Sequence, residues 1–270
     1  WNLLAGEILA AFGDGPANQA RFHSPGAVAV SREGILYIAD TNNHRIRKLW
    51  PDGSVSTWVG TGEAGFDDGN AAVARFNRPQ GLAWGRDGYL YVADTDNHRI
   101  RKISPHGIVS TLAGGPAGFA DGYASQAAFN FPIGLGFASD GHLLVADTFN
   151  HRIRSVSMTG QVSTLAGSGD AAFADGPALE ARLNAPRALA IDPKGRVYIA
   201  DTGNHRIRVL YQGRLETLVG TGHAGFADGN PAVGQFNQPK GLILQGQRLW
   251  VADSGNQRIR AIELFEPQFK

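Results

Sequence analysis

Apolar positions along this chain occur in short runs, and turn-forming residues separate the runs. Segments 79–84, 89–94 and 98–103, for example, are rich in valine, isoleucine, leucine and aromatic residues. Such composition favours β-strands. The connections contain Asp-Gly, Pro-x-Gly and Asn-rich sequences, whose residues accept positive φ or preset a turn. The pattern therefore predicts strands joined by tight turns and no long helix.

One segment recurs five times at a nearly constant spacing. In each copy a strand ends in an aspartate, and Asn-His-Arg-Ile or a close variant follows it. These aspartates are Asp40, Asp94, Asp147, Asp201 and Asp253, so successive copies are 54, 53, 54 and 52 residues apart. A fixed period of this size indicates a repeat architecture.

Each repeat contains four strand-like segments. In the second repeat they are 79–84, 89–94, 98–103 and 109–114, ordered from the axis outward. Four antiparallel strands repeated radially describe a blade of a β-propeller. Since each strand type occurs five times, we predict an all-β propeller with five four-stranded blades, formed by residues 1–270 as one domain.

The two ends of the chain predict how the ring closes. Residues 1–6 align with the outer strand at 55–60, whereas the chain ends after a third strand at 257–264. We expect strand 1–6 to pair with the last blade and so to remove two exposed sheet edges. A longer array cut at the same place would have the same pattern.

The repeated Asn-His-Arg-Ile sequence resembles the NHL repeat, and the resemblance extends over essentially the whole chain. The matching positions are 43–46, 97–100, 150–153 and 204–207, and the fifth copy has Gln257 in place of the histidine. Segment 60–83 resembles the long repeats of many bacterial NHL proteins. The resemblance implies a propeller, usually of six blades, that serves mostly as a binding platform. A minority of relatives are enzymes with a metal in the central channel.

Composition narrows the functional classes. The net charge is +1, from 25 basic and 24 acidic residues, which gives no general attraction to nucleic acid or anionic membranes. No apolar run approaches the roughly 18–20 residues of a membrane span. The chain has no cysteine, so cysteine content does not indicate the redox state of its compartment. A secreted or periplasmic location is slightly favoured. A start at Trp1 and a single methionine, Met158, indicate a processed protein or an excised domain. We expect a monomer that can be one domain of a longer chain.

Residues present in every copy are expected to build the fold, because a single site occupies one place on a ring. The aspartates can accept turn N–H groups or pair with the adjacent Arg45 and its equivalents. The histidines are expected to make structural hydrogen bonds; they are His44, His98, His151 and His205. The alternative is a ring of metal ligands, but neighbouring blades place the histidines too far apart for bonds of about 2.1 Å to one ion. We therefore expect no metal and no cofactor.

The long segment before each first strand has its own signature. A phenylalanine recurs in it, and we expect this residue to anchor the loop in a structured collar on the face of the Asn-rich turns. The phenylalanines are Phe12, Phe66, Phe119, Phe173 and Phe226. An Asp-Gly pair also recurs, Asp68 and Gly69 in the second copy, and we expect it to cap one or two helical turns.

Function is expected where the copies differ. The residue after the proline of each first strand should lie near the channel mouth. These residues are Gly26, Gln80, Ile133, Arg187 and Lys240. Two cations and an amide suit an anionic or polyhydroxy ligand, although charged mouths also occur without ligands. The turn tips and the collar vary too, and they complete one candidate binding face with Asn42, Asp96, Phe149, Glu63, Asp170 and His223.

Three functions are weighed against these positions. We favour a non-catalytic scaffold that presents the loop face and the channel mouth to a protein, peptide or glycan ligand. The alternative is a metal-dependent lyase or lactonase-type hydrolase that acts in the channel. Family members of this kind carry histidine or glutamate metal ligands on their inner strands. In this chain, the positions beside the prolines of the first strands hold neither residue. RNA binding would need a strongly basic face. Since there is no G-x-S-x-G elbow, cysteine or phosphate-binding glycine loop, we expect no catalytic residue.

Overall fold

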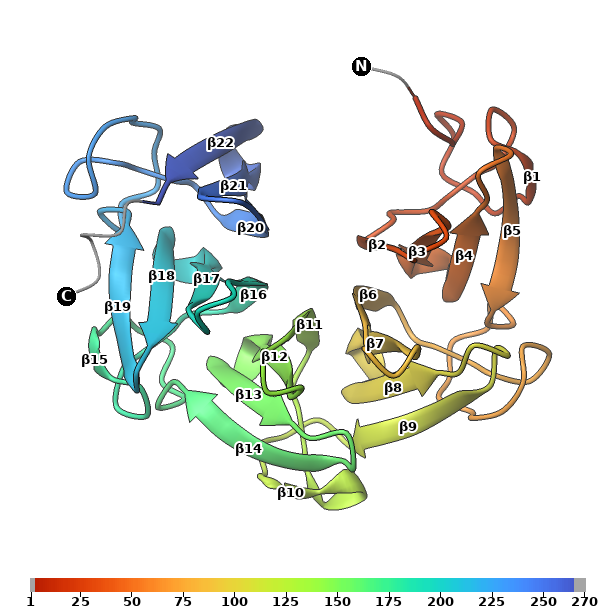
Figure 1. The fold of residues 1–270 in the computed structure, drawn as a ribbon, viewed down its shortest axis with the longest axis horizontal. Helices are drawn as coiled ribbons and strands as arrows, with labels where there is room; N and C mark the ends of the chain where they lie inside the picture. Colours follow the sequence, from red (N-terminus) through yellow and green to blue (C-terminus); the bar gives the residue numbers. More distant parts are fainter. Residues whose placement is uncertain (1–2, 265–270) are drawn as a thin grey trace. The chain divides into compact units, whose positions relative to one another are not determined.

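Short strands make up almost all of the regular structure in the computed structural model, which describes residues 3–264 (Figure 1). The strands form five small antiparallel sheets, one for each repeat. The chain divides into two compact units, Trp1–Leu135 with Met158–Gln161 and Gly136–Ser157 with Val162–Lys270. The prediction of an all-β protein with five propeller blades is confirmed. No helix in the described part of the chain is long and apolar enough to cross a membrane.

The first unit contains the first two blades. The first sheet has the strand order β1-β5-β4-β3-β2. Its strands are β1 (Gly15–Pro16), β2 (Ala27–Val30), β3 (Leu36–Asp40), β4 (Arg45–Leu49) and β5 (Ser54–Val59). The second sheet has the order β6-β7-β8-β9. Its strands are β6 (Pro79–Trp84), β7 (Leu90–Asp94), β8 (Arg99–Ile103) and β9 (Val109–Gly114). Because β2 to β5 and β6 to β9 are neighbours both in sequence and in the sheet, the four predicted strands of these two repeats and their order are confirmed.

The boundary between the two units runs through the third sheet, whose order is β10-β14-β13-β12-β11. Its strands are β10 (Gly122–Tyr123), β11 (Pro132–Phe137), β12 (Leu143–Asp147), β13 (Arg152–Val156) and β14 (Gln161–Ala166). The fourth sheet repeats this order with β15 (Gly176–Pro177), β16 (Pro186–Ile191), β17 (Val197–Asp201), β18 (Arg206–Tyr211) and β19 (Arg214–Val219). The fifth sheet consists of β20 (Pro239–Gln245), β21 (Arg248–Asp253) and β22 (Arg258–Glu263).

Three sheets have a short outer strand that the sequence analysis assigned to a helix cap. In the first blade Gly15 and Pro16 pair with Val55 and Ser54 of β5. Gly15 has φ +135°, a conformation that glycine adopts readily and that brings the chain alongside the sheet edge. The preceding Asp14 is bound to Arg47 at 2.5 Å, so its carboxylate is engaged elsewhere. The expected Asp14 cap is therefore wrong here, although one helical turn does follow, with the Ala20 N–H donating to the Pro16 carbonyl at 2.9 Å. The Gly15–Pro16 segment also covers the edge of β5.

Residues 3–6 form no strand, in contrast to the prediction of an outer strand over 1–6. The Gly6 N–H donates to the Ala17 carbonyl at 2.8 Å, and the Glu7 N–H donates to the Ala20 carbonyl at 2.9 Å. These bonds hold the segment against the loop of the first blade. Residues 1 and 2 lie outside the described residues, and within 3–264 the last sheet has three strands.

In the second collar loop a different phenylalanine from the predicted one is the anchor. Phe66 remains 56% exposed, and the Arg99 guanidinium lies over its ring at 4.1 Å from the centroid. Ten residues later, Phe76 is fully buried in a cluster with Val59, Leu90 and other core residues of the first two blades. The expectation that Phe66 packs the loop is corrected: Phe76 provides the anchor, because the loop crosses the core at that point.

Candidate functional site

The repeated aspartate is a fully buried acceptor of three hydrogen bonds. In the second blade Asp94 Oδ1 accepts the Asn77 N–H at 2.7 Å. Its Oδ2 accepts Asn97 Nδ2 at 2.8 Å and Arg101 Nη1 at 2.7 Å. Burial nevertheless raises the pKa of Asp94 to about 6, against the lowering effect of these donors. Because the carboxylate is satisfied within its own blade, the predicted structural role is confirmed.

The arginine that pairs with this aspartate is the second of the motif, two residues beyond the expected one. Arg101 is fully buried, and it also binds Asp68 at 2.7 Å and the carbonyls of Arg75 and Asp67 at 3.0 and 2.9 Å. It therefore joins the hairpin to the collar loop. The same ion pair recurs in the other blades, as Arg47–Asp40, Arg154–Asp147, Arg208–Asp201 and Arg260–Asp253.

The threonine and the histidine of the motif bind the next blade along the chain. A 3₁₀ turn over Thr95–Asn97 leaves His98 in the left-handed conformation, with φ +55°. Thr95 Oγ1 donates to the Pro132 carbonyl at 2.8 Å, and His98 Nδ1 accepts the Phe131 N–H at 3.2 Å. Equivalent histidine contacts are His44 with Arg78, His151 with Ala185 and His205 with Gln238. The predicted structural hydrogen bonding of the histidines is confirmed.

Replacing His98 by glutamine is expected to change how stability depends on pH. Burial lowers the pKa of His98 below its ordinary 6.5, so the unfolded chain takes up the proton first and stability is lost as the pH falls through 6.5. Glutamine can still accept the Phe131 N–H but does not titrate.

The measurement is urea unfolding of both proteins at pH 7.5 and 5.5. Between pH 7.5 and pH 5.5 we expect the wild type to lose more unfolding free energy than the variant. The excess loss should be less than about 1 kcal/mol, because His98 is partly exposed and its charge is screened by solvent. Asp94 titrates in the same range but is common to both proteins. An unchanged difference would mean that the His98 proton is not coupled to folding.

Three of the predicted channel-mouth residues occupy β-bulges. The pairing register shifts between Pro79 and Gly81, between Pro186 and Ala188, and between Pro239 and Gly241. Gln80, Arg187 and Lys240 are thus the extra residues. A bulge changes the direction of the side chain it carries and is frequent beside binding sites. In the first blade the equivalent residue is Gly26, where a Cβ atom would approach Thr41 Oγ1 to 2.7 Å.

Arg187 and Lys240 lie at equivalent positions of β16 and β20, which are neighbouring inner strands of the second unit (Figure 1). Neither side chain forms an ion pair or a hydrogen bond within residues 3–264. Burial lowers the pKa of Arg187, yet a guanidinium remains charged at neutral pH. In the first unit Gln80 and Ile133 are half-buried at the matching positions of β6 and β11. The second unit therefore supplies two cations with free hydrogen-bonding capacity.

Two of the predicted face residues of the first unit, Asn42 and Asp96, are linked through Arg78. Asn42 Oδ1 accepts Arg78 Nε at 3.2 Å, and Arg78 Nη1 lies 3.6 Å from Asp96 Oδ2. Asp96 Oδ1 is buried and has no hydrogen-bond partner in the described part of the chain. Glu63 forms an exposed ion pair with Arg75 at 3.0 Å. The structure thus brings Asn42 and Asp96 together, while Glu63 engages its own loop.

The face residues of the second unit are exposed at separate loops. Phe149, at the tip of a 3₁₀ turn, is 45% exposed. Asp170 lies 3.5 Å from Arg182 of its own loop. The backbone N–H of His223 donates to Thr221 Oγ1 at 3.4 Å. The collar and the turns share one face, since Asn204 Nδ2 donates to the loop carbonyl of Ala172 at 2.8 Å.

The repeated network identifies the family. The profile of the NHL repeat matches residues 22–49, 76–103, 129–154 and 183–210. In the first two segments the match runs through the first three strands of a blade and includes the aspartate, the threonine and the histidine described above. The chain belongs to the NHL-repeat family. The fifth copy, with Gln257 in place of histidine, lies outside the matched segments.

Curated relatives of this NHL protein are longer chains. NHL repeat-containing protein 2 of Bos taurus is 30% identical, and the match covers 89% of this chain and 46% of the relative. Protein SUPPRESSOR OF QUENCHING 1, chloroplastic, of Arabidopsis thaliana is also 30% identical, with 89% of this chain and 30% of the relative covered. The chain therefore spans less than half the length of these relatives.

Solved structures share the fold of this NHL protein at low identity. An auxiliary nutrient binding protein from Bacteroides thetaiotaomicron superposes with a TM-score of 0.61 and 19% identity, over 96% of this chain and 75% of that chain. A streptogramin B lyase superposes with a TM-score of 0.56 and 18% identity, over 85% and 62%. At such identity the likeness carries the fold and no catalytic residue. In residues 3–264 no group of three His, Cys, Asp or Glu side chains is arranged to hold a metal.

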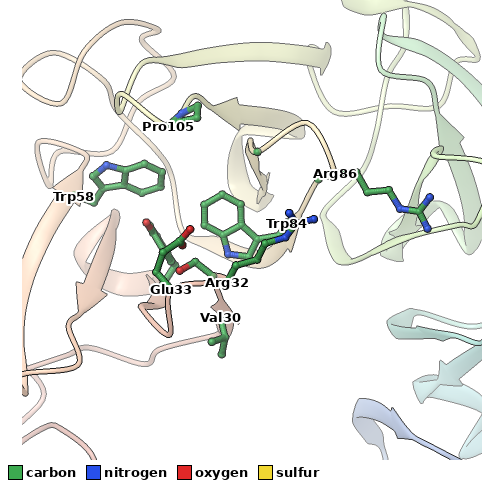
Figure 2. Close-up of a pocket in the computed structure, with 11 residues that line it drawn as sticks. Val30, Arg32, Glu33, Trp58, Trp84, Arg86 and Pro105 are labelled. Atoms are coloured by element: carbon green, nitrogen blue, oxygen red, sulfur yellow. The ribbon is translucent and has the colours of Figure 1, made fainter.

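A pocket of the NHL protein that the sequence analysis missed lies in the first unit, beside the turns that follow β2, β6 and β8. Its volume is about 360 Å³ (Figure 2). The turns after β2 and β6 contribute Arg32, Glu33 and Arg86, and the strands contribute Tyr37, Trp58 and Trp84. The available signal was a break in the repeat, since the positions of Trp58 in the next three copies are Leu112, Leu165 and Leu218.

Proposed function

We propose that residues 1–270 act as one non-catalytic binding domain, whose channel-mouth end binds an anionic group of a protein, peptide or glycan ligand. The observation that carries this proposal is the pair Arg187 and Lys240. Both cations sit on bulges of adjacent inner strands, and neither has an ionic partner within residues 3–264.

The second arginine of each repeated motif supplies a contrast that supports this proposal. Arg47 and its equivalents in every blade are each neutralised by a buried aspartate. Arg187 is half-buried and lacks such a partner, although a desolvated charge without one is costly. A carboxylate ligand would provide two acceptor oxygens in the geometry that a guanidinium binds best. Lys240 would strengthen the attraction as a second positive charge.

Binding of acidic ligands tests the proposal. Hexaglutamate and trigalacturonic acid serve as test ligands for the peptide and the glycan case, and hexaglutamine and maltotriose are their neutral counterparts. We expect calorimetry to detect binding of at least one acidic ligand, and Arg187→Gln or Lys240→Gln to weaken it about tenfold, or about 1.4 kcal/mol. The affinity should also fall with salt.

Arg214→Gln is the matched control, because Arg214 is an exposed arginine at the start of β19. It should leave the affinity unchanged. Equal binding by wild type and by both channel-mouth variants, or failure of both acidic ligands to bind, would overturn the proposal. Salt-dependent RNA binding that the same two variants abolish would replace the peptide or glycan ligand with a nucleic acid.

A further inference from the structure

The pocket between the first and second blades is built from aromatic rings that meet at one tyrosine. Tyr37 contacts Trp58 and Trp84 edge to face, with ring centroids 4.7 and 4.9 Å apart. Figure 2 shows the Glu33 side chain between Trp58 and Trp84, with Arg86 directed away from them. A volume of about 360 Å³ lies in the range of pockets that hold small molecules.

Corresponding pockets in the second unit provide an internal comparison. The one between the third and fourth blades has about 270 Å³ and is lined by Leu144 and Leu165, at the positions of Tyr37 and Trp58. The one between the fourth and fifth blades has about 180 Å³ and contains Leu244, at the position of Trp84. A depression between blades is thus a product of the repeat. The two tryptophans are not required by the repeat, because leucine fills both positions in other blades.

The polar groups of the pocket limit the charge of a ligand. Arg32 and Arg86 oppose a cationic ligand, and Glu33 opposes an anionic one. The aromatic faces already receive an internal cation, because Lys48 Nζ lies 4.5 Å from the Trp58 centroid and 5.2 Å from that of Tyr37. A neutral ligand with several hydroxyl groups avoids these conflicts, since a carboxylate accepts hydroxyl hydrogens and a guanidinium donates to hydroxyl oxygens.

One donor in the pocket wall is unsatisfied. Trp84 Nε1 is buried and has no hydrogen-bond partner within the described residues. Buried donors without partners are uncommon in folded proteins, and a leucine at this position, as in the fifth blade, would remove it. The indole is therefore retained at some cost to the fold, which favours a role in binding.

We propose that this pocket binds a pyranose unit of a neutral oligosaccharide. Trp58 and Trp84 provide aromatic area against the C–H faces of the sugar, and Glu33 accepts hydrogen bonds from its hydroxyl groups. This site is distinct from the channel-mouth cations, which lie in the other unit and at the opposite ends of the strands.

Neutral trisaccharides test the proposal directly. Cellotriose, xylotriose and chitotriose are titrated against the full chain, with calorimetry and tryptophan fluorescence as readouts. We expect at least one to bind saturably at millimolar concentration or below. Trp58→Leu and Trp84→Leu, which introduce the residue that other copies carry, should each weaken binding at least about tenfold. Glu33→Gln should weaken it several-fold, because an amide is a poorer acceptor than a carboxylate.

Matched variants separate this site from the other one. Phe226→Leu alters a half-exposed aromatic residue of a collar loop and should leave trisaccharide binding unchanged, as should Arg187→Gln. Equal urea midpoints for the variants and the wild type exclude unfolding as the cause of any loss. The proposal is overturned if no trisaccharide binds, if both tryptophan variants bind like wild type, or if Arg187→Gln abolishes binding.

Discussion

Replacing Arg101 by methionine is expected to lower the free energy of unfolding by about 3–5 kcal/mol. The substitution keeps much of the apolar length of the side chain but removes the guanidinium. Asp94, which is fully buried, then loses its ion pair at 2.7 Å, and the carbonyls of Arg75 and Asp67 lose their donors. An unpaired buried carboxylate is among the most costly defects that a single substitution creates.

Urea unfolding of the wild type and of the variant measures this effect. Arg214→Gln is again the control, because that arginine is 58% exposed and pairs with Glu216 at the surface. It should cost less than about 1 kcal/mol. The double variant Arg101→Met with Asp94→Leu should recover part of the loss, since no buried charge remains. A cost for Arg101→Met as small as that of Arg214→Gln would contradict the assignment of this network as the support of the blade.

Phe76→Ala is expected to cost about 3–5 kcal/mol, and Phe66→Ala less than about 1 kcal/mol. Both residues belong to the same collar loop, but only Phe76 is fully buried, whereas Phe66 covers Arg99 at the surface. Removing a buried ring leaves a cavity as well as losing transfer free energy. Removing an exposed ring loses mainly one cation–π contact.

The same urea unfolding experiment distinguishes the two phenylalanines. Because they are ten residues apart in one loop, the pair controls for any general sensitivity of that loop to substitution. A cost for Phe66→Ala equal to that of Phe76→Ala would support the original prediction that Phe66 is the anchor.

The period and the turn residues were sufficient to predict the four main strands of the first four blades and their order, but not the short outer strands β1, β10 and β15. Repetition also identified Asp94 and His98 as structural, because a residue present in every blade must serve every blade. The arginine partner could not be chosen in the same way. Asp94 is directly opposite Arg99 across the hairpin, but Arg101 is on the same face of the strand. Only the position of the collar loop, with Asp68 beside Arg101, decides between them.

The sequence predicted only part of the candidate binding site. The sequence shows that Arg187 and Lys240 follow the prolines of their strands. It does not show that both residues lie on β-bulges, because a bulge depends on how the strand pairs with its neighbour. The aromatic pocket was missed for another reason. Variation between copies was sought at the channel mouth, the Asn-rich turns and the collar, whereas Trp58 and Trp84 lie on an outer and an inner strand and meet only through Tyr37.

The joint between blades has a consequence for how such a chain can grow. Thr95 and His98 of one blade bind Pro132 and Phe131 of the next, and the second blade in turn offers Pro79 and Arg78 to the first. An in-frame DNA segment one repeat long therefore encodes both halves of the joint, wherever within the repeat the segment begins. Tandem duplication or loss of a whole repeat leaves every remaining junction chemically matched, so blade number can change in one genetic event without new interface residues.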